Sequence, residues 1–202
     1  MTDATRLVVM ATGNTGKLRE IIELLSNQNI DVVAQSELGV IPVEETGDTF
    51  VENALQKARN AARQTGRPAI ADDSGLAVDA LGGDPGVRSA RYAGPQATNQ
   101  DNIDKLLTAL RGERNRAAHF HCAAVFVRNA DDATPLIAEG VWRGAISDAP
   151  KGDGGFGYDP IFFDLESQLT SAELTAEQKN AKSHRGRAIR NLCQQMMTNW
   201  QA

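Results

Sequence analysis

The sequence has two cysteines, no long apolar run and fewer basic than acidic residues. Cys122 and Cys193 share no metal-ligand spacing, and Cys122 lies in an apolar segment typical of a small core residue. No apolar run approaches the roughly 20 residues that span a bilayer. The first residues lack the basic and long apolar regions of a secretory signal. We therefore expect a reducing, cytoplasmic environment and no membrane partner.

The net charge of −5 argues against non-specific nucleic-acid binding, which depends on broad phosphate neutralisation. It does not exclude a small polyanion held by a few lysines and arginines around a divalent cation. A composition of 41% apolar and 23% charged residues in 202 positions is typical of a globular protein with a real core.

Strands and helices intermingle along the chain without strict alternation. This pattern predicts an α/β fold with a mixed sheet. We expect strands at 6–11, 30–34, 69–72, 76–78, 120–127 and 136–146. We expect helices at 17–26, 49–64 and 102–111, a short one after Thr175, and a last one from Ser183 to about Trp200. The Gly/Pro-rich stretch 82–95 reads equally as an ordered functional loop or a flexible one.

Two adjacent carboxylates, Asp72 and Asp73, end the apolar stretch 68–71 and precede Ser74 and Gly75. Unpaired acids near a core usually indicate a metal ion, a proton to move or a cationic partner. A solvated acidic turn is the alternative, because Asp, Ser and Gly are common turn residues. Extended backbone would send the two side chains to opposite sides, so one of them would meet a metal directly.

The segment from Thr12 to Lys17 joins an expected strand to an expected helix, where backbone N–H groups and the helix dipole attract anions. It is not a P-loop, since Ala11 and Leu18 replace the required Gly and Ser or Thr. A plain tight turn is an equally good interpretation of these residues alone. Glu44 could ligate Mg²⁺ or merely complement a helix N-terminus, and Lys57 could reach a phosphate or be solvated.

Later segments offer groups that could bind a planar base. Phe156 stands among glycines, where a ring is easily approached, although it could equally pack in the core. Lys179 and Arg185 carry only hydrogen-bond donors. Such donors can bind the 6-oxo group of a purine, whereas the 6-amino group of adenine is itself a donor and is disfavoured. Most basic residues near a helix end are merely solvated.

Taken together and in order, six segments resemble the noncanonical purine nucleoside triphosphate pyrophosphatases, also called inosine/xanthosine triphosphatases. The resemblance covers the chain from Val8 to about Leu192. The segments are 11–14 with Lys17, 44–47, 71–76, 86–92, 155–160 and 183–186.

The resemblance implies hydrolysis of ITP, dITP and XTP to the monophosphate and pyrophosphate. It also implies a Mg²⁺ cofactor, a homodimer, and a single domain over residues 1–202. The implied fold is an elongated mixed β-sheet flanked by helices, with two lobes and a central cleft. By the same resemblance, Asp73 is the catalytic acid/base and a metal ligand, and Glu44 can join the metal. The implied substrate contacts are Thr12, Gly13, Asn14, Thr15, Gly16, Lys17, Ser74, Phe156, Gly157, Tyr158, Asp159, Lys179, His184 and Arg185, to which we add Lys57.

Three alternatives stay open at this point. The chain could be a pyrophosphatase for modified pyrimidine triphosphates, or a nucleotide-binding module without catalysis. The basic stretch from Lys182 to Arg190 could contact nucleic acid, although the acidic total disfavours this.

Overall fold

The computed structural model describes residues 6–25 and 30–200, which fall into two compact units. Unit 1 comprises the described residues within 1–73, 122–140 and 185–202, and unit 2 comprises 74–121 and 141–184. The division passes through three strands and just before Arg185. Each unit has its own core.

The described strands form one seven-stranded sheet in the order β2-β1-β3-β4-β5-β6-β7. β1 pairs in parallel with both β2 and β3, whereas β6 is antiparallel to β5 and β7. The sheet is therefore mixed, and the predicted α/β class is confirmed. The strands are β1 (Arg6–Met10), β2 (Ile30–Ala34), β3 (Ala69–Val78), β4 (Ala117–Val127), β5 (Leu136–Ile146), β6 (Phe162–Asp164) and β7 (Leu169–Thr170).

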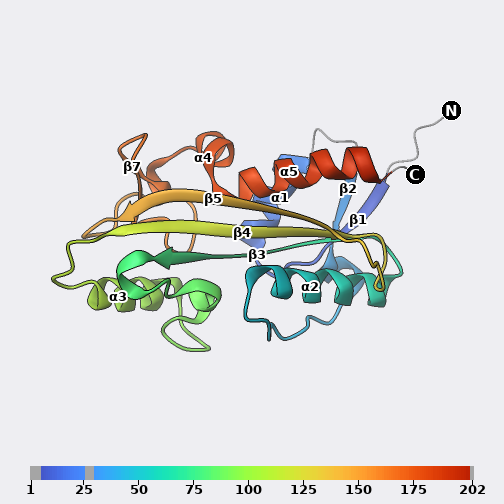
Figure 1. Ribbon diagram of the computed structural model, residues 1–202, viewed down its shortest axis with the longest axis horizontal. Coiled ribbons are helices and arrows are strands. Elements are labelled where there is room, and N and C mark those ends of the chain that lie inside the picture. Colours follow the sequence, from blue (N-terminus) through green and yellow to red (C-terminus); the bar gives the residue numbers. More distant parts are fainter. Residues whose placement is uncertain (1–5, 26–29, 201–202) are drawn as a thin grey trace. The chain divides into compact units, whose positions relative to one another are not determined.

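Helices cover both faces of the sheet in unit 1 (Figure 1). α1 (Thr15–Leu25) and α5 (His184–Asn199) share a cluster with Val8, Met10 and Ile70. α2 (Phe50–Thr65) packs its alanines, among them Ala54 and Ala58, on the opposite side of the same strands. Alternation along each strand separates the two clusters, because successive side chains point to opposite faces.

Unit 2 has a single large cluster in which α3 (Asn99–Ala109) packs Ile103 and Leu106 against Trp142 and Phe162. α4 (Ala176–Lys182) begins at the N-cap Thr175, whose side chain accepts from the Gln178 N–H. Four short 3₁₀ turns complete the described chain: η1 (Gln35–Leu38), η2 (Asp79–Leu81), η3 (Gly86–Arg91) and η4 (Ser171–Glu173).

Several sequence-based boundaries were wrong. The acidic pair does not lie on a turn, because β3 runs unbroken from Ala69 to Val78. β6 and β7 were missed, since three and two residues are too short to show a pattern. The helix expected from residue 102 begins at Asn99, after the N-cap Thr98.

The structure bears on some other expectations, and one lies outside the described chain. The 82–95 stretch is ordered around η3, where Ser89 Oγ accepts from the Leu76 N–H at 2.9 Å. Cys122 is a buried free thiol, as expected of a core residue. The expected helix end at Ser26 lies outside the described residues. Within 6–25 and 30–200, no helix has the length and apolarity to cross a bilayer. The two lobes and the central cleft stay a prediction.

Candidate active site

The acidic pair lies in the middle of β3, with its two side chains on opposite faces of the sheet. Asp73 continues the row of Ala69 and Ala71, which faces α2, and Asp72 continues the row of Ile70, which faces α1 and α5. Both carboxylates are buried, Asp72 completely. An ionised acid so far from water must find a cationic or hydrogen-bonding partner, and each finds a different set.

Asp73 is contacted from α2. Its Oδ1 lies 3.2 Å from Lys57 Nζ, and its Oδ2 accepts a hydrogen bond of 3.2 Å from Asn53 Nδ2. Burial raises the pKa of Asp73, and the negative charges of Glu45 and Asp72 raise it further, against the lowering effect of Lys57 and Lys17. A buried carboxylate with a raised pKa is suited to accept a proton.

Lys57 joins Asp73 to a second acid. Its Nζ lies 2.7 Å from Glu45 Oε1, so one ammonium bridges two carboxylates. Burial opposes the charge of Lys57, but Asp73, Asp72 and Glu45 raise its pKa above the usual value. Glu44, the predicted metal ligand, is exposed, and the structure places its neighbour Glu45 at this centre.

Asn53 was missed by the sequence analysis although it is fully buried. Its amide also accepts a hydrogen bond of 2.8 Å from the Gly47 N–H, which fixes the segment before α2. Asn53 and Lys57 are four residues apart and so share one helix face. A polar residue on an otherwise alanine-rich inner face was the signal that could have found it.

Asp72 has cations from two helices. Its Oδ2 lies 3.3 Å from Lys17 Nζ on α1 and 3.1 Å from Arg185 Nε on α5. Burial opposes ionisation, but Lys17, Arg185 and Lys57 together hold the pKa of Asp72 well below its usual range. Arg185 also bonds Glu20, a partner that no sequence pattern indicated. The ionised Asp72 therefore holds two predicted substrate-contacting cations in place.

The Thr12–Lys17 turn leads into α1. Asn14 Oδ1 accepts from the Gly16 and Lys17 N–H groups, at 2.9 and 3.1 Å, and Thr12 Oγ1 accepts from the Asn14 N–H. A methyl group added at Gly13 would meet nothing within 4 Å. The turn is thus shaped by its own side chains and open at Gly13. Thr15 is the first residue of α1 and is exposed, and Ser74, which follows Asp73 in β3, is half-buried.

A second set of predicted residues comes together in unit 2 around Asp159. Asp159 Oδ2 accepts from Lys179 Nζ at 2.7 Å and from the Phe156 N–H at 2.8 Å. Lys179 Nζ lies 5.0 Å from the centroid of the Phe156 ring. A ring and an ammonium held by one carboxylate form a natural contact for a planar base with an acceptor edge.

Other predicted residues of unit 2 pack in its core. Tyr158 is buried, and its hydroxyl donates to Ser89 O at 2.9 Å. His184 stacks on Phe120, with ring centroids 4.6 Å apart and an interplanar angle of 12°. Gly157 adopts a φ of 62°, which favours glycine. These contacts give Tyr158 and His184 a packing role whatever else they touch.

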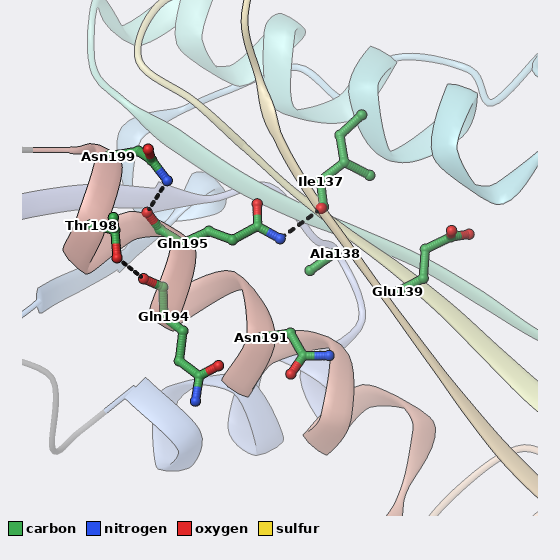
Figure 2. Close-up of a pocket in the computed structure, with 8 residues that line it drawn as sticks. All are labelled: Ile137, Ala138, Glu139, Asn191, Gln194, Gln195, Thr198 and Asn199. Atoms are coloured by element: carbon green, nitrogen blue, oxygen red, sulfur yellow. Dashed lines mark hydrogen bonds between the residues drawn. The ribbon is translucent and has the colours of Figure 1, made fainter.

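A hollow beside α5 in unit 1 offers different chemistry (Figure 2). Its amide groups bond neighbouring backbone: Gln195 Nε2 donates to Ile137 O at 3.0 Å, and Asn199 Nδ2 donates to Gln195 O at 2.9 Å. Glu139 is the single ionisable residue among those that line it, so we do not consider it a catalytic site. The lining residues are Ile137, Ala138, Glu139, Asn191, Gln194, Gln195, Thr198 and Asn199.

The fold and these two polar sets define an α/β protein with a buried carboxylate–lysine centre on a sheet strand. A sequence model of the Ham1 family matches residues 8–195, so the chain belongs to the Ham1 family.

Curated relatives match over nearly the whole chain. The dITP/XTP pyrophosphatases of Pectobacterium atrosepticum and Escherichia coli O157:H7 are each 58% identical over 187 residues, which is 92% of this chain and 95% of the relative. Among solved structures, a HAM1 protein from Coxiella burnetii has a TM-score of 0.89 and 49% identity, covering 96% of this chain and 99% of its own. The Staphylococcus aureus Ham1 protein has a TM-score of 0.85 and 39% identity over the same shares of the two chains.

Proposed function

We propose that this protein hydrolyses noncanonical purine nucleoside triphosphates (ITP, dITP and XTP) to the monophosphate and pyrophosphate. Relatives named dITP/XTP pyrophosphatase, 58% identical over most of the chain, support this activity. The structural observation that carries it is Asp73: a buried carboxylate with a raised pKa, bonded to Lys57 in a unit that also holds Lys17.

Asp73 is the proposed acid/base. Its carboxylate accepts a proton from the water that attacks the α-phosphorus, and Asn53 keeps the carboxylate in place through the bond to Oδ2. Lys57 and Lys17 neutralise phosphate oxygens, with Asp72 and Glu45 fixing the two ammonium groups. Most of the rate gain in such a site comes from positioning and fixed charge.

The residues fit a magnesium ion that is shared with substrate. Glu45 and Asp73 flank one cation, Lys57 Nζ, at 2.7 and 3.2 Å, so two carboxylates of the kind that Mg²⁺ prefers lie beside it. The described residues contain no group of three or more His, Cys, Asp or Glu that could hold a metal by themselves. Mg²⁺ commonly takes one or two carboxylates and completes its shell with water and substrate phosphates. Asp73 would hold it with Glu44 or Glu45, and when bound it offsets charge on the leaving pyrophosphate.

Base selection is assigned to Phe156, Lys179, His184 and Arg185. The ring of Phe156 stacks on the purine, and Lys179 and Arg185 offer donors to the 6-oxo group. Adenine presents a donor at that position, so a buried donor would stay unpaired, which costs about 1–3 kcal/mol. The amides of the Thr12–Lys17 turn and the Ser74 hydroxyl complete the contacts to the phosphates.

A homodimer in the cytoplasm, without nucleic-acid or membrane partners, completes the proposal. The net charge of −5 supports the exclusion of nucleic acid.

A substrate panel tests the activity. Pyrophosphate release from ITP, dITP and XTP should exceed release from ATP, GTP and dUTP, and should require Mg²⁺ and stop with EDTA. Faster turnover of dUTP than of ITP would assign the protein to pyrimidine substrates. Binding of ITP without pyrophosphate release would leave only a nucleotide-binding module.

A further inference from the structure

Three glycines of the loop 151–159, here called the glycine loop, have no place in the phosphate or metal chemistry. A Cβ added at Gly152 would lie 2.7 Å from the carbonyl carbon of Ala172, and one at Gly154 would lie 2.7 Å from Ala172 O. A Cβ at Gly155 would lie 2.0 Å from Asp159 Oδ2. These contacts are too close for any side chain. The glycine loop is therefore packed directly on the backbone of η4 and on the carboxylate of Asp159.

The residues 170–173, here called the clamp, bond the glycine loop along its length. Thr170 Oγ1 donates to Lys151 O at 2.8 Å, and the Gly154 N–H donates to Ala172 O at 3.1 Å. The Ala172 N–H donates to Asp159 O at 3.2 Å. The clamp is itself fixed by Glu173, whose carboxylate accepts from the Thr170 N–H at 2.7 Å.

One side-chain bond links the clamp to the base-contacting groups. Ser171 Oγ donates to Asp159 Oδ1 at 2.9 Å, and both residues are buried. The other oxygen of Asp159 accepts from Lys179 Nζ and from the Phe156 N–H. The serine hydroxyl therefore sets the rotation of the carboxylate that holds the ammonium and the ring.

We propose that Ser171 is a positioning residue for base selection: by orienting Asp159, it holds the Lys179 ammonium beside the Phe156 ring, where it meets the 6-oxo edge of the purine. This inference rests on the proposed function, because it assumes that Phe156 and Lys179 contact the base. It assigns Asp159 the task of orienting these two groups through its carboxylate.

The test compares Ser171→Ala with Ser167→Ala. Ser167 Oγ donates to Asp164 Oδ2 at 2.6 Å, so each variant removes one serine hydroxyl from one buried aspartate of unit 2. Asp164 contacts Trp142 and Lys182, not the base-contacting groups. We expect Ser171→Ala to lower the ITP-to-ATP ratio of kcat/KM about tenfold, chiefly through a higher KM for ITP, because one charged donor is misplaced. Ser167→Ala should leave the ratio within about twofold at a comparable loss of Tm.

Three further variants, one of them a control, keep the inference falsifiable if Ser171→Ala folds poorly. Gly155→Ala should displace Asp159 from the other side and lower the same ratio. Gly112→Ala is its control, because Gly112 also has a positive φ, 80° against 74°, but open space at the Cβ position. Ser171→Thr, which keeps the hydroxyl, should retain a larger share of the ratio than Ser171→Ala.

Equilibrium binding of IMP and AMP separates this inference from the hydrolase assignment. Ser171→Ala should weaken IMP binding about tenfold and AMP binding much less, because both bases would stack on Phe156 but only the 6-oxo edge uses Lys179. The inference would be overturned if Ser171→Ala kept both the wild-type ITP-to-ATP ratio of kcat/KM and the wild-type IMP-to-AMP ratio of affinities. If the wild-type protein prefers IMP to AMP but releases no pyrophosphate from ITP, only the hydrolase assignment would be rejected.

Discussion

Two buried carboxylates, Asp73 in unit 1 and Asp159 in unit 2, anchor the two polar sets and are built differently. Asp73 lies on a regular strand and is contacted from a regular helix at 3.2 Å on each oxygen. Asp159 lies at the end of the glycine loop and accepts three bonds of 2.7 to 2.9 Å from a lysine, a serine and a backbone N–H.

The difference is consistent with the role proposed for each carboxylate. The contacts of Asp73 do not offset its burial beside Glu45 and Asp72, so its pKa is raised and it can take up a proton or a cation. Asp159 has short bonds to groups that it positions. The proposed reactive acid thus has one longer contact on each oxygen, whereas the proposed scaffolding acid has three shorter ones.

Asp73→Asn should have the largest effect, because it removes the carboxylate proposed to react. Removing the acid/base should lower kcat on ITP by at least about a thousandfold. The raised pKa means that the ionised form costs folding free energy at pH 7, so the neutral amide should leave the stability unchanged or higher. Steady-state kinetics with urea unfolding checks both parts. Turnover near that of wild type would remove Asp73 from the chemistry.

Lys57→Met should be the next largest effect. The ammonium lies between Asp73 and Glu45, so its loss leaves two carboxylates without their shared cation and the phosphates without a counter-charge. We expect kcat to fall about a hundredfold on ITP and ATP alike, with an unchanged ratio between them. A change in that ratio would mean that Lys57 reads the base.

Lys179→Met tests the polar set of unit 2 by removing the ammonium that Asp159 holds. We expect a loss of about tenfold in the ITP-to-ATP ratio of kcat/KM with a small change in kcat, because the donor acts on the base and not on phosphorus. Kinetics on both nucleotides, run beside Lys57→Met, provides the measurement. Equal losses on the two substrates would place Lys179 with the phosphate groups.

The sequence predicted the regular parts of the fold well. The parallel start of the sheet follows from the strand–turn–helix–strand order of residues 6–34, and the capping box at Thr49 and Glu52 marks the start of α2. β3 was misread because Asp72, Asp73 and Ser74 are typical of turns. Neighbouring strands and the helices on both faces of the sheet supply the partners that keep these polar residues in a strand. These partners are distant in the sequence, so no local pattern reveals them.

The candidate site was predicted as a set of residues but not as a set of contacts. Alternation along an extended strand was enough to separate Asp72 from Asp73. Asn53, Glu20 and Ser171 were missed because their importance comes from partners far away in the sequence, such as Arg185 for Glu20. Arg185 was assigned to the base from its donor-only side chain and from the family resemblance, and the structure adds Asp72 and Glu20 as the groups that hold it.

Asp164→Asn should give the smallest effect and tests a buried acid in unit 2 that is saturated like Asp159. Burial opposes its charge, but donors from Lys182, Ser167 and Trp142 lower the pKa of Asp164 to about 2. Since the folded pKa lies below the unfolded value near 4, the stabilisation is present above pH 4 and is lost as the pH falls towards 2. We expect the variant to lose about 2 kcal/mol at pH 7, with kcat on ITP within about twofold of wild type.

The stability difference between wild type and Asp164→Asn should shrink as the pH falls. About half of the stabilisation by Asp164 should be gone at pH 3, so the free energies of unfolding of wild type and Asp164→Asn should converge between pH 5 and 3. Urea unfolding at pH 7, 5, 4 and 3 measures this. Parallel curves would show that the amide keeps the bonds to Trp142 and Ser167 and that the charge contributes nothing. Asp73→Asn, measured in the same series, should diverge from Asp164→Asn, because a raised pKa makes ionisation of Asp73 a cost that grows as the pH increases.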